Sequence, residues 1–253
     1  MTQPPWASGS AEILKHGLDL LKKDTDSNRR LAMISIDNAV ELMIKTYLGL
    51  PKRVTGLNIS RSDYQEFAEN FTKLLDALEK HANTKLGGID LGEIEWYHRL
   101  RNQLYHQGNG LTVERNKVEV YAELANVLFE NLFGLRLVEP ETNETVVLGE
   151  FMKAWVDFEK TISEAAETLS VALPYKGGRE IPPFQIAESL SKEGYISRIE
   201  LDEINQIRKT RNEIVHGHMN YKETIKPEMT KRVVSLTREL KERLQSKRPD
   251  KKP

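Results

Sequence analysis

The chain has 253 residues, long enough for one large domain or for two of ordinary size. Charged residues make up 30% and hydrophobic residues 39%, the balance of a globular protein whose helices expose polar faces. The formal net charge of −1 gives no global attraction to nucleic acid or anionic lipid, so a site for a polyanion must be a local patch. Because the chain has no cysteine, disulfides, thiolate metal sites and a cysteine nucleophile are excluded.

The N-terminus shows no targeting or membrane signal. Met1 to Ser10 holds no basic segment followed by an apolar run. No later stretch has the uninterrupted apolar length that crosses a bilayer. We therefore expect a cytoplasmic protein with no membrane partner.

Apolar residues recur at helical spacing through the first half of the chain. They predict helices over residues 13–21, from Asp26 or Ser27 to residue 48, from Ser60 or Ser62 to residue 78, from Asp90 to His106, and over residues 113–133. Glycine follows the second of these helices at Gly49 and the fourth at Gly108. The pattern predicts an N-terminal all-α domain over residues 1–136.

The sequence changes character after residue 134. A turn-rich stretch around Pro140 with β-branched Val146 and Val147 predicts a linker over residues 137–150. Helical patterns then cover residues 151–173, 183–191, 197–216 and the segment from Pro227 onward. Ser197 and Glu200 are expected to form a capping box at the start of the third of these helices. They predict a second all-α domain over residues 151–245, followed by a basic disordered tail over residues 246–253.

One short sequence occurs in both halves. Arg101-Asn102-Gln103-Leu104-Tyr105-His106 matches Arg211-Asn212-Glu213-Ile214-Val215-His216 at an offset of 110 residues (211 − 101), and each copy is closely followed by glycine. The same offset superposes apolar and acidic positions upstream, including Glu93 on Glu203 and Ile94 on Ile204. A repeat at domain spacing indicates two related copies of one helical unit, although the match is confined to one helix per half.

The residues of the repeated motif suit chemistry at a phosphate. Arginine is a permanent forked donor for phosphate oxygens, and histidine titrates near neutral pH, where a helix C-terminus favours its charged form. Asparagine can orient the histidine or bind the substrate. Residues five apart lie about 140° apart around a regular helix. The histidine must therefore swing round at the helix end to approach the arginine.

These residues also have simpler interpretations, as structural or surface residues. A single copy of the motif could be a helix C-cap with a cation near the negative end of the dipole. His98 lies one turn before Arg101, where it could assist the motif, although a surface histidine is the simpler interpretation; His218 has no ligand cluster around it. Glu41 and Lys45 are expected to form an intrahelical pair. Two basic groups, His98-Arg99-Arg101 and Arg208-Lys209-Arg211, concentrate charge as an RNA site requires, but solvated helix faces look similar.

The chain resembles a tandem pair of HEPN (higher eukaryotes and prokaryotes nucleotide-binding) domains. The resemblance is carried by Arg-Asn-x-x-x-His at the end of a helix, by the segment from Ile36 to Lys45 in the first half, and by Pro182-Pro183-Phe184 in the second. It implies two helical bundles and a metal-independent endoribonuclease of the kind found in toxin–antitoxin, abortive-infection and CRISPR systems. The implied catalytic residues are Arg101, Asn102, His106, Arg211, Asn212 and His216, with no metal and no cofactor.

The mechanism implied by the resemblance uses the 2′-OH of RNA as the nucleophile. One histidine removes its proton, the other protonates the leaving 5′-oxygen, and the arginines stabilise the phosphorane. The partners expected are an RNA substrate, a second copy of the chain and a regulatory or neutralising protein. The two motifs are expected to share one concave surface, within one chain or across a dimer. The alternative is a non-catalytic helical module that binds a nucleotide or a partner protein.

Overall fold

The computed structural model describes residues 5–106, 112–135, 137, 143–171, 173 and 181–246. Every regular element in these ranges is a helix, so the predicted all-α class is confirmed. The chain divides into two compact units, residues 1–145 with 215–217, and residues 146–214 with 218–253. No helix in the described ranges is long and apolar enough to cross a membrane. The tail from residue 247 onward and linker positions 138–142 lie outside the described residues.

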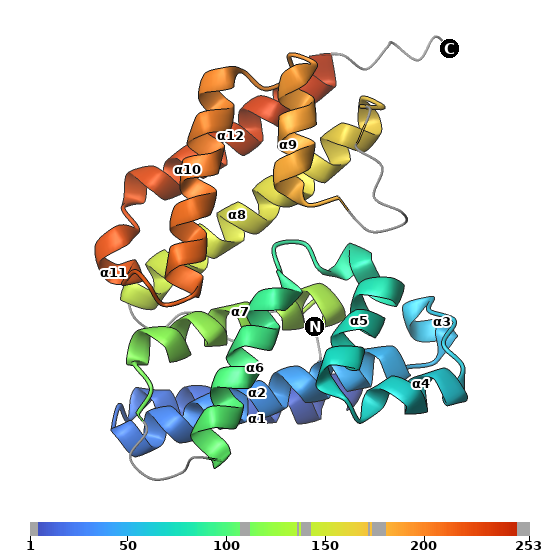
Figure 1. The fold of residues 1–253 in the computed structure, drawn as a ribbon, viewed down its shortest axis with the longest axis vertical. Helices are drawn as coiled ribbons and strands as arrows, with labels where there is room; N and C mark the ends of the chain where they lie inside the picture. Colours follow the sequence, from blue (N-terminus) through green and yellow to red (C-terminus); the bar gives the residue numbers. More distant parts are fainter. Residues whose placement is uncertain are drawn as a thin grey trace. The chain divides into compact units, whose positions relative to one another are not determined.

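The N-terminal unit is organised around one long helix, α2 (Figure 1). α2 packs against α1, α5, α6 and α7, and Ile36, Met43 and Ile44 on its inner side are fully buried. The elements of this unit are η1 (Pro5–Ala7), α1 (Ser8–Lys22), α2 (Asp26–Gly49), α3 (Lys52–Thr55), α4 (Arg61–Ala68), α5 (Phe71–Ala82), η2 (Asn83–Lys85), α6 (Leu91–His106) and α7 (Arg115–Phe133).

The predicted helix from residue 60 to residue 78 is wrong, because the chain forms two helices there. Ser60 caps α4, and Asn70 caps α5 by accepting a hydrogen bond from the backbone N–H of Lys73 at 3.0 Å. Sequence periodicity misses this break because the apolar spacing continues across Glu69 and Asn70. The break sets the direction of α5, whose first residue, Phe71, contacts α6.

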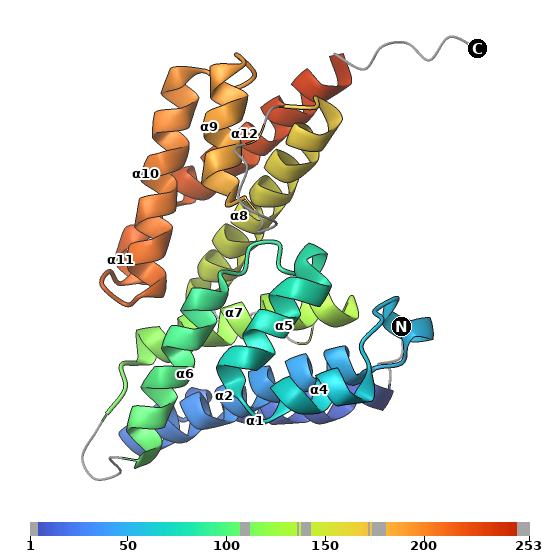
Figure 2. The same ribbon diagram turned by 45° about the vertical axis from the view of Figure 1, so that its right-hand side comes forward.

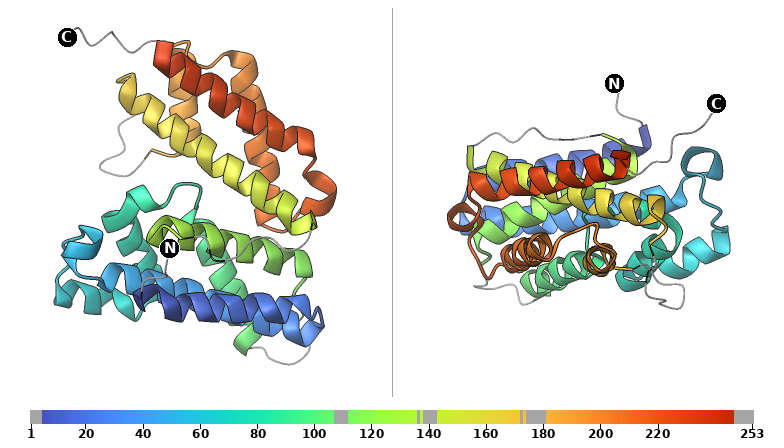
Figure 3. Two further views of the ribbon diagram at one scale, coloured as in Figure 1. Left: turned by 180° about the vertical axis from the view of Figure 1, so that it is seen from behind. Right: turned by 90° about the horizontal axis from the view of Figure 1, so that it is seen from above.

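The C-terminal unit contains α8 (Asn143–Thr168), α9 (Pro183–Lys192), α10 (Arg198–Val215), α11 (Tyr221–Thr224) and α12 (Pro227–Ser246). The views of this unit show α9 and α10 side by side in one layer (Figure 2), with α8 and α12 in the other (Figure 3). α8 begins at Asn143, not at residue 151, so the predicted linker is partly helical. Leu148 and Phe151 are buried in the core, which explains why this helix extends so far towards its N-terminus.

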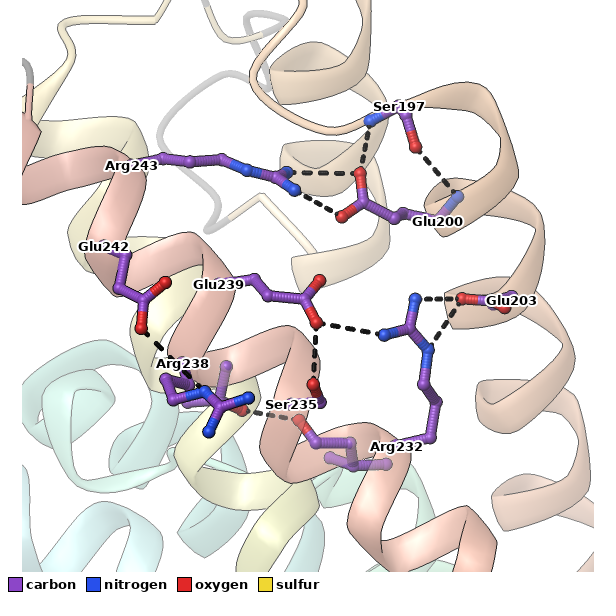
Figure 4. Close-up of polar contacts among 11 residues, drawn as sticks. Ser197, Glu200, Glu203, Arg232, Ser235, Arg238, Glu239, Glu242 and Arg243 are labelled. Carbon is purple, nitrogen blue, oxygen red and sulfur yellow. Dashed lines mark hydrogen bonds and ion pairs between the residues drawn. The ribbon is translucent and has the colours of Figure 1, made fainter.

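Ion pairs join α10 to α12 (Figure 4). Arg243 binds both carboxylate oxygens of Glu200, at 2.6 and 3.1 Å, and Arg232 binds Glu203 at 2.5 Å. The predicted capping box at the start of α10 is confirmed: Glu200 accepts from the backbone N–H of Ser197 at 2.7 Å, and Ser197 accepts from that of Glu200 at 3.2 Å. These contacts fix the start of the helix that carries the second motif.

Candidate functional site

The first motif lies in the last turns of α6, where the helix crosses α2. His98 and Arg101 are three residues apart, so they are neighbours on one face of α6. Both side chains are largely covered, with 15% and 16% of their surfaces exposed. This face of α6 is therefore a partly buried site that solvent still reaches.

A single buried carboxylate, Asp37 of α2, holds this site together. Oδ2 of Asp37 lies 2.8 Å from Nε of Arg101 and 3.0 Å from Nδ1 of His98, and Oδ1 accepts a hydrogen bond from the hydroxyl of Tyr121 at 2.8 Å. Asp37 is fully buried, and a charge in that position is tolerated only when it is paired and hydrogen-bonded. Burial and then the charge of Asp37 raise the pKa of Tyr121 well above its usual range, which keeps its hydroxyl a donor.

Arg101 is held by further contacts around its guanidinium. One terminal nitrogen donates to Oδ1 of Asn38 at 2.8 Å, and the other donates to Oδ1 of Asn102 at 2.9 Å. Glu41 lies 3.9 Å away and is itself paired with Lys45 at 2.7 Å, which confirms the predicted intrahelical pair. A guanidinium has more N–H groups than these partners use. Arg101 is thus oriented by the protein and still has donors for an oxyanion.

The interpretation of His98 as an ordinary surface histidine is wrong. Its imidazole stacks on the ring of Phe71, with ring centroids 3.7 Å apart and planes 7° apart. The stack covers one face of the ring, and the bond to Asp37 fixes its rotation. Sequence reasoning discounted His98 because the chain positions of Phe71 and Asp37 gave no sign that both reach α6.

His106 is the last residue of α6, and its side chain lies outside the described residues. Since the helix continues to His106, the backbone of this residue faces about 140° away from that of Arg101, as expected for a spacing of five. Tyr105, the residue before His106, is 63% exposed. The approach of His106 to Arg101 stays a prediction.

The second motif differs in its surroundings. Arg211 is only 4% exposed, whereas Asn212 and His216 are partly exposed. α10 ends at Val215, and His216 follows immediately, before Gly217 in the left-handed conformation with φ of 69°. The division between the two units falls inside this motif: Arg211 and Asn212 belong to the C-terminal unit and His216 to the N-terminal unit. Convergence of the two motifs depends on the placement of the units and also stays a prediction.

The offset of 110 residues relates further contacts in the two units. Arg208 occupies the position of His98 (208 − 98), and its guanidinium lies over the ring of Phe184 at 4.3 Å from the centroid. Phe184 lies in the first turn of α9, just as Phe71 begins α5. In each unit the residue three places before the motif arginine therefore stacks on a phenylalanine from the preceding helix.

Asp37, Glu41 and His98 are the described residues whose ligand atoms gather closely enough for a metal ion, all within 4.8 Å of one another. The guanidinium of Arg101 shares the same oxygen of Asp37, which places a positive charge where a cation would bind. Glu41 is also neutralised by Lys45. The charges around this cluster therefore favour an anionic ligand beside Arg101 over a cation.

Sequence reasoning found the motif but missed Asp37 as its centre. Asp37 lies among Met33, Ile36, Val40 and Ile44, at the spacing of the buried stripe of α2. A charged residue inside an apolar stripe indicates a buried partner, and that signal was available. The identity of the partner was not, because it depends on how α2 and α6 cross.

Comparison of the chain with protein-family models, curated proteins and solved structures finds no match.

Proposed function

We propose that this protein is a metal-independent endoribonuclease that cleaves RNA through attack of the 2′-OH on the adjacent phosphate. The ion pair between Asp37 and Arg101 supports this proposal most directly. It holds a permanent positive charge, with donors to spare, at a partly exposed position beside titratable groups. A preoriented cation of this kind stabilises the charge that develops on a phosphorane.

In the proposed reaction, the motif arginine binds the non-bridging oxygens of the scissile phosphate and Asn102 holds that arginine in place. The 2′-oxygen gives up its proton to a base and bonds to phosphorus. The bond to the 5′-oxygen then breaks, and that oxygen takes a proton from an acid. The products are a 2′,3′-cyclic phosphate and a 5′-hydroxyl. His106 and His216 are the motif residues proposed for these proton transfers, and Arg211 and Asn212 form the second set.

The decisive experiment is incubation of the purified chain with total RNA in the presence of EDTA. RNA fragments that end in a 2′,3′-cyclic phosphate, with a DNA of the same sequence left intact, support the proposal. Cleavage that requires a divalent metal contradicts the proposal, because it indicates a metal-activated nucleophile. Cleavage of DNA at a similar rate also contradicts it, because DNA has no 2′-OH.

Variants of the two motif histidines separate one shared site from two. If both motifs form one site, H106A and H216A each lose activity by about 100-fold or more, the usual cost of removing a general acid or base. If each motif works with its counterpart in a second copy, the single variants keep part of the activity and only the double variant loses all of it. A toxin or defence role would appear as growth arrest on expression of the wild type and not of the double variant.

The burial of Arg211 favours a second candidate, a non-catalytic helical module that binds a nucleotide or a protein. An arginine only 4% exposed has little surface left for a substrate. In this case the wild type binds a nucleotide or partner and cleaves no RNA. Titration calorimetry with mononucleotides, run beside the cleavage assay, distinguishes the two functions.

A further inference from the structure

The imidazole of His98 is prepared for proton transfer by its neighbours. Nδ1 of His98 lies 3.0 Å from Oδ2 of Asp37, the carboxylate oxygen that Arg101 also contacts, and in the tautomer protonated at Nδ1 it donates a hydrogen bond to that oxygen. This tautomer leaves the lone pair on Nε2. No described residue forms a hydrogen bond with Nε2, and the side chain keeps 15% of its surface exposed.

The contacts around His98 come from two other helices, α5 and α2. Phe71 of α5 covers one face of the ring, and Asp37 of α2 fixes the nitrogen at its edge. The charged or titratable groups nearest to His98 are Asp37, Glu41 and Arg101. Lys45 is linked to this group by its ion pair with Glu41, and Tyr121 by its hydrogen bond to Asp37. An imidazole with one nitrogen bound to a buried carboxylate and the other free is the arrangement of a general base.

We propose that His98 is a further catalytic residue of the N-terminal unit and that Asp37 is the positioning residue that sets its tautomer. The inference rests on the proposed RNA cleavage and names a base that the Arg-Asn-x-x-x-His motif does not include. His98 is three residues from Arg101, on the same face of α6, and both contact the same carboxylate oxygen. A phosphate bound by Arg101 therefore lies next to His98.

The proposed step conserves every atom and proton. Nε2 of His98 takes the proton of the 2′-OH as the 2′-oxygen bonds to phosphorus, and the ring becomes an imidazolium stabilised by Asp37. The bond from phosphorus to the 5′-oxygen breaks, and that oxygen receives a proton from His106 or His216; with His98 as the base, the motif histidines supply only the acid. The imidazolium of His98 then returns its proton to solvent.

The equivalent position in the C-terminal unit supports this assignment. Arg208 keeps the stacking contact with a phenylalanine but carries a permanent charge, so it cannot accept a proton. A residue needed only to cover the phenylalanine ring could be a histidine or an arginine. The histidine occurs in the N-terminal unit, where Asp37 binds it.

The test measures cleavage of a defined RNA in EDTA by the full chain and by H98A, with and without added imidazole. We expect H98A to lose about 100-fold or more of the wild-type rate. Free imidazole should restore part of that rate, because it can enter the space beside Phe71 and supply the missing base. H98Q keeps an amide donor for Asp37 and serves as the variant in which the fold is best preserved; it should lose activity by a similar factor.

Two controls isolate the chemistry. His16 is an exposed histidine on α1, and H16A should keep the wild-type rate. R208A removes the matching stack on Phe184, and added imidazole should not raise its rate.

Each outcome decides between the proposals. Activity of H98A or H98Q within a few-fold of the wild type overturns the role of His98 and leaves the proposed function standing. A loss that imidazole cannot restore, in a variant with the wild-type fold by circular dichroism, also overturns it. A wild type that cleaves no RNA refutes the proposed function itself, and the role of His98 with it.

Discussion

α6 and α10 carry the same motif and the same stacking contact, yet their surroundings differ. His98 lies 3.7 Å above Phe71 and binds the buried Asp37, whereas Arg208 lies 4.3 Å above Phe184. Arg101 is partly exposed, and Arg211 is 4% exposed. A short sequence match therefore does not settle whether two copies do the same work. The helix that each copy packs against decides which side chains are buried and which can meet a ligand.

One ion pair from each unit shows the same difference. In the N-terminal unit Arg101, His98 and Tyr121 converge on one buried carboxylate, whereas in the C-terminal unit Arg232 and Glu203 pair where 35% and 40% of their side chains are exposed. Exposed pairs gain little because water screens them, and buried pairs are costly to break. The N-terminal unit thus depends on its polar centre for stability as well as for the proposed chemistry.

The largest expected effect is on stability, from removal of Asp37. D37A leaves Arg101 without its buried counterion and Tyr121 and His98 without their acceptor, so it should lower the free energy of unfolding by about 3 to 5 kcal/mol. R232A, which breaks the exposed pair, should cost about 1 kcal/mol or less. Urea unfolding of both variants measures the difference. Equal losses would show that burial of Asp37 does not distinguish the two units.

The next prediction concerns the two motif arginines. R101A should reduce RNA cleavage by about 100- to 1000-fold, the usual cost of removing a group that stabilises an oxyanion. R211A removes a side chain of the second motif that is also buried, so besides its effect on cleavage it should lower the free energy of unfolding by about 2 to 4 kcal/mol. Cleavage rates and urea unfolding on both variants provide the comparison. An R211A variant with wild-type stability would contradict this prediction, because the burial of Arg211 would then contribute nothing to the fold.

A smaller loss of stability is expected when the charge of Glu200 is removed. Glu200 forms the ion pair with Arg243 in the C-terminal unit. Its bonds to Arg243, helped by Ser197, lower the pKa of Glu200 from 4.5 to about 2. Because the pKa is lowered on folding, the contribution is complete above pH 4.5 and is lost as the pH falls towards 2. E200Q should therefore cost about 1 to 2 kcal/mol at pH 7, a figure reduced for solvent screening, and almost nothing near pH 2.

Thermal unfolding from pH 7 to pH 2 tests this prediction. E203Q is the matched control, because Glu203 lies on the same helix and also binds an arginine of α12, but is more exposed. E203Q should cost less at pH 7. A stability difference between E200Q and the wild type that does not change with pH would contradict the proposed role of the carboxylate charge.

Sequence alone predicted the all-α fold because apolar spacing and caps are local signals. The helix from Asp26, the capping box of Ser197 and Glu200, and the pair Glu41–Lys45 all appear in the structure. The break at Asn70 and the early start of α8 were missed. Both depend on packing: Asn70 interrupts an apolar pattern that would otherwise continue, and α8 begins early because Leu148 meets the core.

The site was predictable only in part, for a related reason. Residues on one helix, such as His98 and Arg101, could be grouped by their spacing. Asp37, Phe71 and Tyr121 are distant in the sequence and come from three other helices, so their meeting at α6 is a property of helix crossing. Sequence reasoning therefore gave the motif and not the carboxylate that holds it.

The smallest expected effect is the loss of stability from the motif histidines, and it contrasts directly with His98. His106 ends α6 and His216 follows α10, where a histidine interacts modestly with the helix dipole, and the ring of His216 also lies edge-on to that of Trp96, with centroids 5.7 Å apart. H106A and H216A should each lower the free energy of unfolding by about 1 kcal/mol or less. H98A loses a stacked ring and a bond to a buried carboxylate and should cost about 2 kcal/mol. Urea unfolding of the three variants, run beside the cleavage assay, separates chemistry from structure. If H106A or H216A unfolds the protein, the motif is a structural cap in that copy, and catalysis there must be assigned to other residues.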